Sequence, residues 1–286
     1  MSIQIIQQRL NMYSCKTDIE EIQAMREITQ EVVLAALTRG GFFEHAAFQG
    51  GTCLRIFYGL NRFSEDLDFV LKKPILNFQL LDYLTHVHDE LKTFGYDIEI
   101  KDRNKAEGAV KQPFLKDKSI GKILTLKYAG KSSILKQIYI KLEVDSNPPS
   151  GSSYETKYLD FPFASAVTVQ DLSSLFAGKI HALLCRKYLK GRDWYDFIWY
   201  TSHQTGVNFE LLSSAIIQYG SWENTHIEIN REWLLQEMEQ KIISIDWKKA
   251  KEDVRRFIPA IEQPSLEVWH KEFFLSQLAK LKAVLL

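Results

Sequence analysis

The stretch FQGGTCLRIFYGLNRFSEDLDFVL, residues 48–71, begins with two glycines before an apolar segment and ends with two closely spaced aspartates. Apolar residues at helical spacing follow Gly50 and Gly51, whereas charged and apolar residues alternate over 66–71. Such alternation is typical of a strand, and a glycine pair allows a tight turn. The stretch therefore predicts a glycine turn, a helix, a loop and a strand, preceded by a short buried strand over 45–49.

The two aspartates, Asp66 and Asp68, are two residues apart in the predicted strand. Side chains at that spacing leave the same face, so their negative charges repel each other unless a cation lies between them. Mg²⁺ prefers oxygen ligands and commonly binds one or two carboxylates together with substrate phosphates. We therefore expect a metal site here. A strand face that simply exposes both carboxylates to water is the alternative.

The glycine turn predicts an anion site beside these carboxylates. The helix that follows Gly50 and Gly51 offers unpaired amide groups and the positive end of its dipole to a phosphate. Thr52 adds a hydroxyl at the helix start, where an ordinary N-cap is the alternative. Most glycine pairs form ordinary turns without a ligand, so the glycine pair predicts a phosphate site only in combination with the neighbouring carboxylates.

A third carboxylate lies on a later predicted strand, IYIKLEVD, residues 138–145. Its alternation places Glu143 and Asp145 on the polar face. If this strand neighbours the strand of Asp66 and Asp68, Glu143 could complete a metal site or act as a general base. The sequence pattern leaves that adjacency open.

A lysine stands in the apolar stripe of the helix predicted after Asp171. At about 100° per residue, Lys179 lies among Leu175, Phe176 and Leu183. Either its stem reaches the edge of the stripe, or its ammonium group meets an anion inside the fold.

Two further aspartates, Asp193 and Asp196, are three residues apart in the next predicted helix and so share a face. A surface pair between Arg192 and Asp196 is the simpler explanation for the second of them.

The composition excludes several classes of protein. The 286 residues include 36 Lys plus Arg and 36 Asp plus Glu, so no overall field favours nucleic acid or a membrane. The three cysteines have neither disulfide-framework nor zinc-ligand spacing. The first residues lack a secretory signal pattern, and no apolar run is long enough for a membrane span, so we expect a cytoplasmic protein without membrane contact.

The periodicity changes character along the chain. A helix is predicted over 16–38, capped by Asp18, and another over 77–94, followed by strand patterns over 96–102, 122–129, 136–145 and 157–163. After residue 171 helical periods dominate. We therefore expect an N-terminal module over residues 1–165 and an all-helical module over residues 166–286.

Four blocks of this sequence, in this order, resemble one family: GGTCLR, RFSEDLDF, IKLEVDSN and GKIHALLCRKYLKGRDWYDF. They are similar to those of the AbiEii/AbiGii type nucleotidyltransferase toxins, over about residues 48–200. The resemblance implies an α+β fold class, with a mixed-sheet, polymerase-beta-like nucleotidyltransferase core followed by the helical module.

The resemblance also implies roles for individual residues. Asp66, Asp68 and Glu143 fall on the metal-binding carboxylates, with Asp145 and Asp196 as further candidate ligands. Lys179 matches the lysine that holds nucleotide phosphates, and Asp193 matches the acidic residue of the helical motif. The resemblance implies that both are catalytic residues, together with Asp66, Asp68 and Glu143. The remaining nucleotide-binding positions are Gly50, Gly51, Thr52, Arg55, Arg62 and Ser64.

The activity implied by the resemblance is a Mg²⁺-dependent nucleotidyltransferase, with Mn²⁺ as a possible substitute, acting as the toxin of a bacterial toxin–antitoxin system. It would transfer a nucleoside monophosphate from an NTP to RNA, such as the 3′ end of tRNA, and a cognate antitoxin would be its partner. Two alternatives are a metal-dependent phosphohydrolase and a nucleotide-binding interaction module without turnover.

Overall fold

The computed structural model describes residues 2–75, 77–102, 119–128, 137–223 and 225–285. The chain forms two compact units. The first unit comprises Met1–Gly59, Phe63–Pro148 and Tyr154–Val169, and the second comprises Leu60–Arg62, Pro149–Ser153 and Gln170–Leu286. The predicted domain boundary between residues 165 and 166 stays a prediction.

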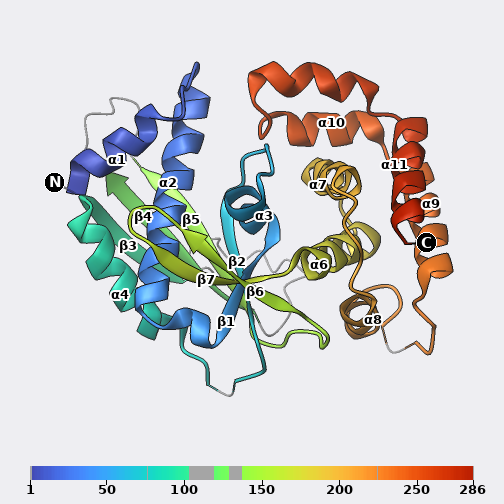
Figure 1. The fold of residues 1–286 in the computed structure, drawn as a ribbon, viewed down its shortest axis with the longest axis horizontal. Coiled ribbons are helices and arrows are strands. Elements are labelled where there is room, and N and C mark those ends of the chain that lie inside the picture. Colours follow the sequence, from blue (N-terminus) through green and yellow to red (C-terminus); the bar gives the residue numbers. More distant parts are fainter. Residues whose placement is uncertain (1, 76, 103–118, 129–136, 224, 286) are drawn as a thin grey trace. The chain divides into compact units, whose positions relative to one another are not determined.

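A seven-stranded mixed sheet forms the centre of the first unit, in the order β3-β4-β5-β2-β1-β7-β6 (Figure 1). Its strands are β1 (Ala46–Gln49), β2 (Asp66–Leu71), β3 (Tyr96–Asp102), β4 (Ser119–Tyr128), β5 (Ile138–Asp145), β6 (Tyr154–Leu159) and β7 (Ser165–Gln170). Strand β2 pairs antiparallel with β1 and parallel with β5, whereas β1 pairs parallel with β7. The mixed sheet confirms that part of the predicted fold class.

Most of the predicted elements of the first unit form close to their expected ends. The helices are α1 (Ser2–Asn11), α2 (Asp18–Arg39), α3 (Gly50–Tyr58) and α4 (Leu80–Thr93), with a short 3-10 helix η1 (Phe42–Glu44). The cap of α2 is Thr17, whose side chain accepts from the Glu20 amide, so the prediction of Asp18 as the cap was wrong. Helix α1 and strand β7 were not predicted from the sequence.

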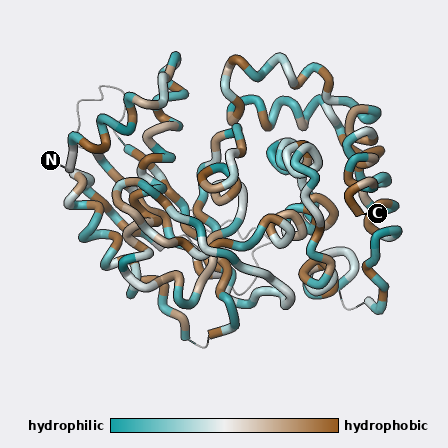
Figure 2. Tube along the Cα trace, in the orientation of Figure 1, coloured by the Kyte–Doolittle hydropathy of each residue, from teal (hydrophilic) through white to brown (hydrophobic). Residues whose placement is uncertain are grey.

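The core of the first unit is built from aromatic and aliphatic residues at the alternating positions of the strands. Phe69 of β2 lies 4.9 Å from Phe42 and 5.3 Å from Phe48, measured between ring centroids. All three are buried, and the central strands carry many of the hydrophobic residues of this unit (Figure 2). Burial of this face of β2 directs Asp66 and Asp68 to the other face, as the period of two requires.

The regular elements of the second unit from Leu172 onward are helical throughout the part that the structure describes. They are α6 (Leu172–Cys185), α7 (Gly191–Ser202), α8 (Phe209–Gln218), α9 (Arg231–Ser244), α10 (Trp247–Arg255), the 3-10 helix η2 (Ala260–Val268) and α11 (Lys271–Val284). Trp194, Trp247 and Phe274 pack against one another, with Trp247 and Phe274 stacked at 3.9 Å. This aromatic cluster joins α7, α10 and α11.

Among the described residues, no helix combines the length and the apolarity that a membrane span requires.

Candidate active site

The paired aspartates and the third carboxylate meet on neighbouring strands of the sheet. Strands β2 and β5 are adjacent and parallel, with Asp68 opposite Glu143 and Asp66 opposite Lys141. Opposite residues of neighbouring strands share a face, so Asp66, Asp68 and Glu143 lie on one side of the sheet, each partly accessible. The adjacency that the sequence left open is therefore confirmed.

The glycine turn contacts Asp68 directly. Gly50 is the first residue of α3 and has a φ of +82°, in the left-handed region that favours glycine. A Cβ atom at this position would lie 2.6 Å from Asp68 Oδ2 and 3.2 Å from Asp68 Cβ. Gly50 is thus required both by the backbone conformation and by the approach of the helix start to the carboxylate.

Thr52 connects the helix to the first residue of β2. Its hydroxyl donates a hydrogen bond to the backbone carbonyl of Asp66, and its side chain is buried. The N-cap of α3 is Gln49, so the alternative role of Thr52 as an N-cap is wrong. The threonine instead fixes the start of β2, and with it Asp66, against α3.

A cation that the sequence analysis gave no role lies within this set of carboxylates. Lys141 is opposite Asp66 on β5, and its Nζ lies 2.9 Å from Glu143 Oε1. On the other side of β5, the partner of Glu143 is Gly121 of β4, which has no side chain to cover the carboxylate. Alternation on β5 already places Lys141 and Glu143 on one face, and this was the signal that could have identified the lysine.

Carboxylates are the ligands that a hard cation such as Mg²⁺ prefers, and the predicted ligands of the first unit differ in their surroundings. Within the described part of the chain, no group of three or more His, Cys, Asp or Glu is arranged to hold a metal. Glu143 is engaged by Lys141, and Asp145 is buried and accepts from the Asn147 amide at 3.1 Å. Asp66 and Asp68 lie on one face of β2, and Mg²⁺ accepts one or two carboxylates of this kind with substrate phosphates, so their binding of a metal stays a prediction.

Two other predicted nucleotide-binding residues have partners within the first unit. The Arg55 guanidinium forms an ion pair with Glu27 of α2 and lies 4.2 Å from the centre of the Phe63 ring. The carbonyl of Ser64 accepts from Gln30 Nε2 at 3.3 Å. These contacts place both residues at the base of the loop that leads into β2, and their contact with a nucleotide stays a prediction.

The second unit brings Lys179 together with both aspartates of α7. Lys179 Nζ lies 2.7 Å from Asp193 Oδ1 and 2.7 Å from Asp196 Oδ2, and its side chain is 13% exposed. Of the two alternatives for this lysine, the ammonium group that meets anions inside the fold is confirmed. The aspartates share one face of α7, as their spacing predicted.

Asp196 is buried and has a second cationic partner. Arg62 Nε and Nη2 donate to Asp196 Oδ1 and Oδ2 at 2.6 and 2.7 Å, and the two side chains are 3% and 0% exposed. The alternative of a surface pair for Asp196 is therefore wrong. Burial lowers the pKa of Arg62, but the neighbouring Asp196 outweighs this effect and raises it.

Asp193 is held in its ionised form. Burial alone would raise the pKa of its carboxyl, but Lys179 and then Arg186 outweigh burial and lower the pKa far below its usual range. Arg186 Nη1 donates to Asp193 Oδ2, whereas Lys179 donates to the other oxygen, Oδ1. Together Arg62, Lys179 and Arg186 carry three positive charges against two carboxylates, so the cluster has a formal charge of +1.

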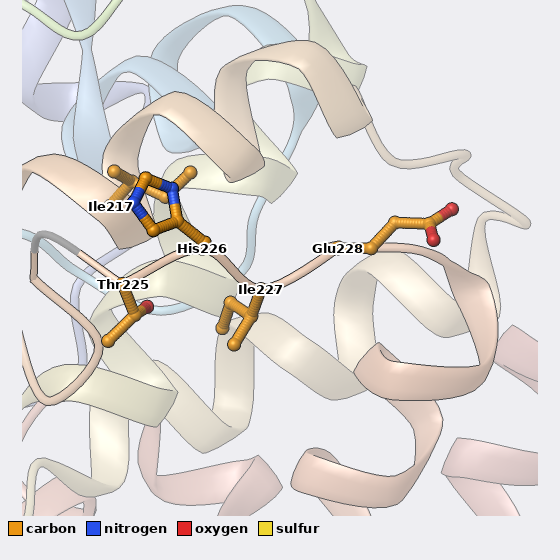
Figure 3. Close-up of a pocket in the computed structure, with 5 residues that line it drawn as sticks. All are labelled: Ile217, Thr225, His226, Ile227 and Glu228. Carbon is orange, nitrogen blue, oxygen red and sulfur yellow. The ribbon is translucent and has the colours of Figure 1, made fainter.

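A surface pocket of the second unit lies outside these clusters. It is lined by Ile217, Thr225, His226, Ile227 and Glu228 (Figure 3). The carboxylate of Glu228 points away from the His226 ring, so the two titratable groups do not converge on one ligand position. This pocket offers no arrangement of acid and base for catalysis.

Comparison with known proteins identifies a family over most of the chain. The profile described as "Nucleotidyl transferase AbiEii toxin, Type IV TA system" matches residues 32–274. The crystal structure of JHP933 from Helicobacter pylori is 17% identical, with a TM-score of 0.47, and the alignment covers 92% of this chain and 90% of that chain. A second structure from H. pylori, provisionally assigned as a nucleotidyltransferase, is 16% identical, with a TM-score of 0.47 over 91% of each chain.

No curated protein sequence matches the chain. Because both TM-scores are below 0.5, neither structural likeness supports an inference about activity. The family profile, by contrast, includes the glycine turn, both strand carboxylate positions and the Lys179 cluster within its matched range. The chain belongs to the AbiEii nucleotidyltransferase toxin family of type IV toxin–antitoxin systems.

Proposed function

We propose that this protein transfers a nucleoside monophosphate from an NTP to a hydroxyl group of RNA, such as the 3′ end of tRNA, in a Mg²⁺-dependent reaction. The observation that carries the proposal is the contact between Gly50, at the start of α3, and the carboxylate of Asp68. It brings together a helix start, which is suited to an anion, and a carboxylate, which is suited to a cation, and a metal–triphosphate complex would need both.

In the reaction, an oxygen of the acceptor attacks the α-phosphorus, the bond from that phosphorus to the bridging oxygen of the β-phosphate breaks, and pyrophosphate leaves. Asp66 and Asp68 would hold Mg²⁺, or Mn²⁺ in its place, and Gly50, Gly51 and Thr52 would present backbone amides to the phosphates. The bound metal supplies positive charge to the phosphate oxygens. Positioning and charge neutralisation are the main requirements of such a transfer.

The acceptor hydroxyl loses a proton, and Glu143 is the carboxylate that suits this step. It lies opposite Asp68 on β5 and is partly accessible. Asp193, the other candidate, is a poor base because Lys179 and Arg186 hold its pKa far below the usual range, after offsetting the effect of burial. We therefore assign Glu143 to orient the hydroxyl and Asp193 to the lysine cluster.

Lys179 would bind the phosphates that leave as pyrophosphate. Its cluster has a formal charge of +1, because two carboxylates are set against three cations. A net positive group stabilises the negative charge that builds on the departing oxygens. We assign this role to Lys179 rather than to Arg62, because the Lys179 side chain is 13% exposed whereas that of Arg62 is 3% exposed.

The acceptor RNA would be bound through basic surface rather than through the aromatic residues of α7. Trp194, Phe197 and Tyr200 are buried in the core of the second unit, so they are not available to stack on bases. Helix α10 and the residue after it present exposed cations suited to RNA phosphates: Lys248, Lys249, Arg255 and Arg256. The family further implies a cognate antitoxin as a protein partner.

The test compares the Asp66→Asn variant with wild type in a mixture of Mg²⁺, each α-labelled NTP and total RNA. Wild type is expected to produce labelled RNA, and the variant is expected to lose about 100-fold or more of that activity while remaining folded. Asp97→Asn, the same change at an exposed position of β3, is the matched control and should retain activity.

Three outcomes of this assay contradict the proposal. Released nucleotide without labelled RNA would indicate the phosphohydrolase, and NTP binding without any product would indicate the nucleotide-binding module. Full activity of Asp66→Asn would remove the metal assignment.

A further inference from the structure

We propose that Arg62 is a positioning residue, which acts through Asp196 to hold the Lys179 ammonium group ready for an anionic ligand. The inference rests on the proposed function in one respect, namely that the ligand is the phosphate of an NTP. It differs from the role expected from the sequence, in which Arg62 itself binds the nucleotide.

The contacts of Asp196 carry the first step. Its Oδ2 accepts from Arg62 Nη2 at 2.7 Å and also lies 2.7 Å from Lys179 Nζ, so one oxygen connects the two cations. Arg62 Nε fixes the other oxygen at 2.6 Å. A two-point pair of this kind sets the plane of the carboxylate, and the plane determines where Oδ2 directs the lysine.

The second step concerns the donors of Lys179. An ammonium group has three N–H donors. One N–H is donated to Asp193 Oδ1 at 2.7 Å, and Asp196 Oδ2 lies 2.7 Å from Nζ on a second side, so we assign the remaining direction to a ligand anion. Rotation of the Asp196 carboxylate would therefore change the direction of the remaining N–H.

Charge gives Arg62 a further effect on the lysine. With Arg62 present, the cluster carries a formal +1, and without it Lys179 and Arg186 would be neutralised by Asp193 and Asp196. A neutral cluster attracts phosphate less strongly, and an uncompensated Asp196 would bind the ammonium group more tightly. Arg62 thus keeps Lys179 available although it touches no ligand itself.

The position of Arg62 in the chain links this cluster to the metal-binding strand. Residues Leu60–Arg62 group with the second unit, and Asn61 also donates to Glu262 there. Arg62 precedes Asp66 by four residues, so covalent geometry keeps their Cα atoms within about 14 Å, whatever the arrangement of the two units.

Burial distinguishes this role from direct phosphate binding. The Arg62 side chain is 3% exposed, and its partner is fully buried. An arginine that binds a triphosphate must present its donors to the ligand, whereas here Nε and Nη2 are directed at Asp196. Of the two cations that contact Asp196, Lys179 has the more exposed side chain, at 13%.

The test is a charge-compensating double variant. Arg62→Met leaves a neutral cluster in which the buried Asp196 carboxylate keeps Lys179 as its cationic partner and has lost the arginine, and we expect the KM for NTP to rise about tenfold or more. Adding Asp196→Asn removes that carboxylate charge and restores the formal +1, so Arg62→Met/Asp196→Asn is expected to recover most of the loss. If Arg62 bound phosphate directly, the second substitution would not restore the KM, and the proposal would be overturned.

A second measurement does not depend on nucleotidyl transfer. Acetylation of Lys179 by an amine-reactive reagent, followed by mass spectrometry, should be slower in Arg62→Met than in wild type and should recover in the double variant. Arg9→Met is the matched control, because it removes an arginine from a similar pair with buried Glu31 and leaves the Lys179 cluster intact. It should leave the labelling of Lys179 unchanged.

The two measurements separate the two proposals. If wild type transfers no nucleotide but Arg62 still controls the labelling of Lys179, the proposed function fails and the positioning role stands. Unchanged labelling of Lys179 in Arg62→Met would overturn the positioning role, even in an active enzyme. If Arg62→Met does not fold, the double variant, which lacks the Asp196 charge, is compared with wild type instead. A KM that is raised by about tenfold or more in the double variant would refute the charge argument.

Discussion

Substitution of Gly50 by alanine tests the contact that places the helix start on Asp68. The new Cβ would lie 2.6 Å from Asp68 Oδ2, and ordinary contact begins at 3.4 Å, so the carboxylate must move by about 0.8 Å. Displacement of a reacting group by about 1 Å can lower a rate by about 100-fold. We therefore expect Gly50→Ala to lose most of its nucleotidyl transfer.

The same substitution also strains the backbone, and a matched control separates the two effects. Gly50 and Gly59 have φ angles of +82° and +79°, and alanine in this region costs about 1–2 kcal/mol at either position. At Gly59, however, no described atom lies within 4 Å of the added Cβ. Both variants should thus lose similar stability, whereas only Gly50→Ala should lose activity.

Stability would be measured as the free energy of unfolding in urea, and activity as the label transferred to RNA. Gly50→Ala and Gly59→Ala should agree in stability to within about 1 kcal/mol. The reasoning is refuted if Gly50→Ala transfers label as fast as Gly59→Ala, because Asp68 would then tolerate the added methyl group.

Two further predictions concern stability. Gly191→Ala would place a Cβ 2.0 Å from the carbonyl oxygen of Ala250, a backbone atom of α10 that cannot move aside, so the free energy of unfolding in urea should fall by about 3 kcal/mol or more. Gly178→Ala is the control, because no described atom lies within 4 Å of its added Cβ, and it should raise the free energy of unfolding by up to about 1 kcal/mol. Burial raises the pKa of Glu31 to about 7 from 4.5, against the opposing effect of Arg9. Because the pKa is higher in the folded protein, the stability that Glu31 contributes is complete below its unfolded pKa and is lost as the pH rises through about 7. The free energy of unfolding should therefore differ less between pH 5 and pH 8 in Glu31→Gln than in wild type. An unchanged difference would contradict this assignment.

The local elements of the first unit could be predicted because each depends on residues close in sequence. The strand over 66–71, the glycine turn and the helix after it follow from alternation, φ preference and helical spacing. The aligned blocks also identified the family, which the profile over residues 32–274 confirms. Two local predictions failed: β7 was missed, and Thr17 rather than its neighbour Asp18 caps α2, since both residue types can accept from a helix amide.

Asp66 and Asp68 share a face and Lys179 stands in an apolar stripe, and both facts can be predicted from sequence because each follows from the period of a single element. The pairing of charges depends on how the elements pack. The register of β2 with β5 places Lys141 beside Asp66, and the packing of the loop between α3 and β2 against α7 brings Arg62 to Asp196 across 134 positions of sequence. Pairs so distant depend on the burial and packing of whole elements, and no local period encodes them.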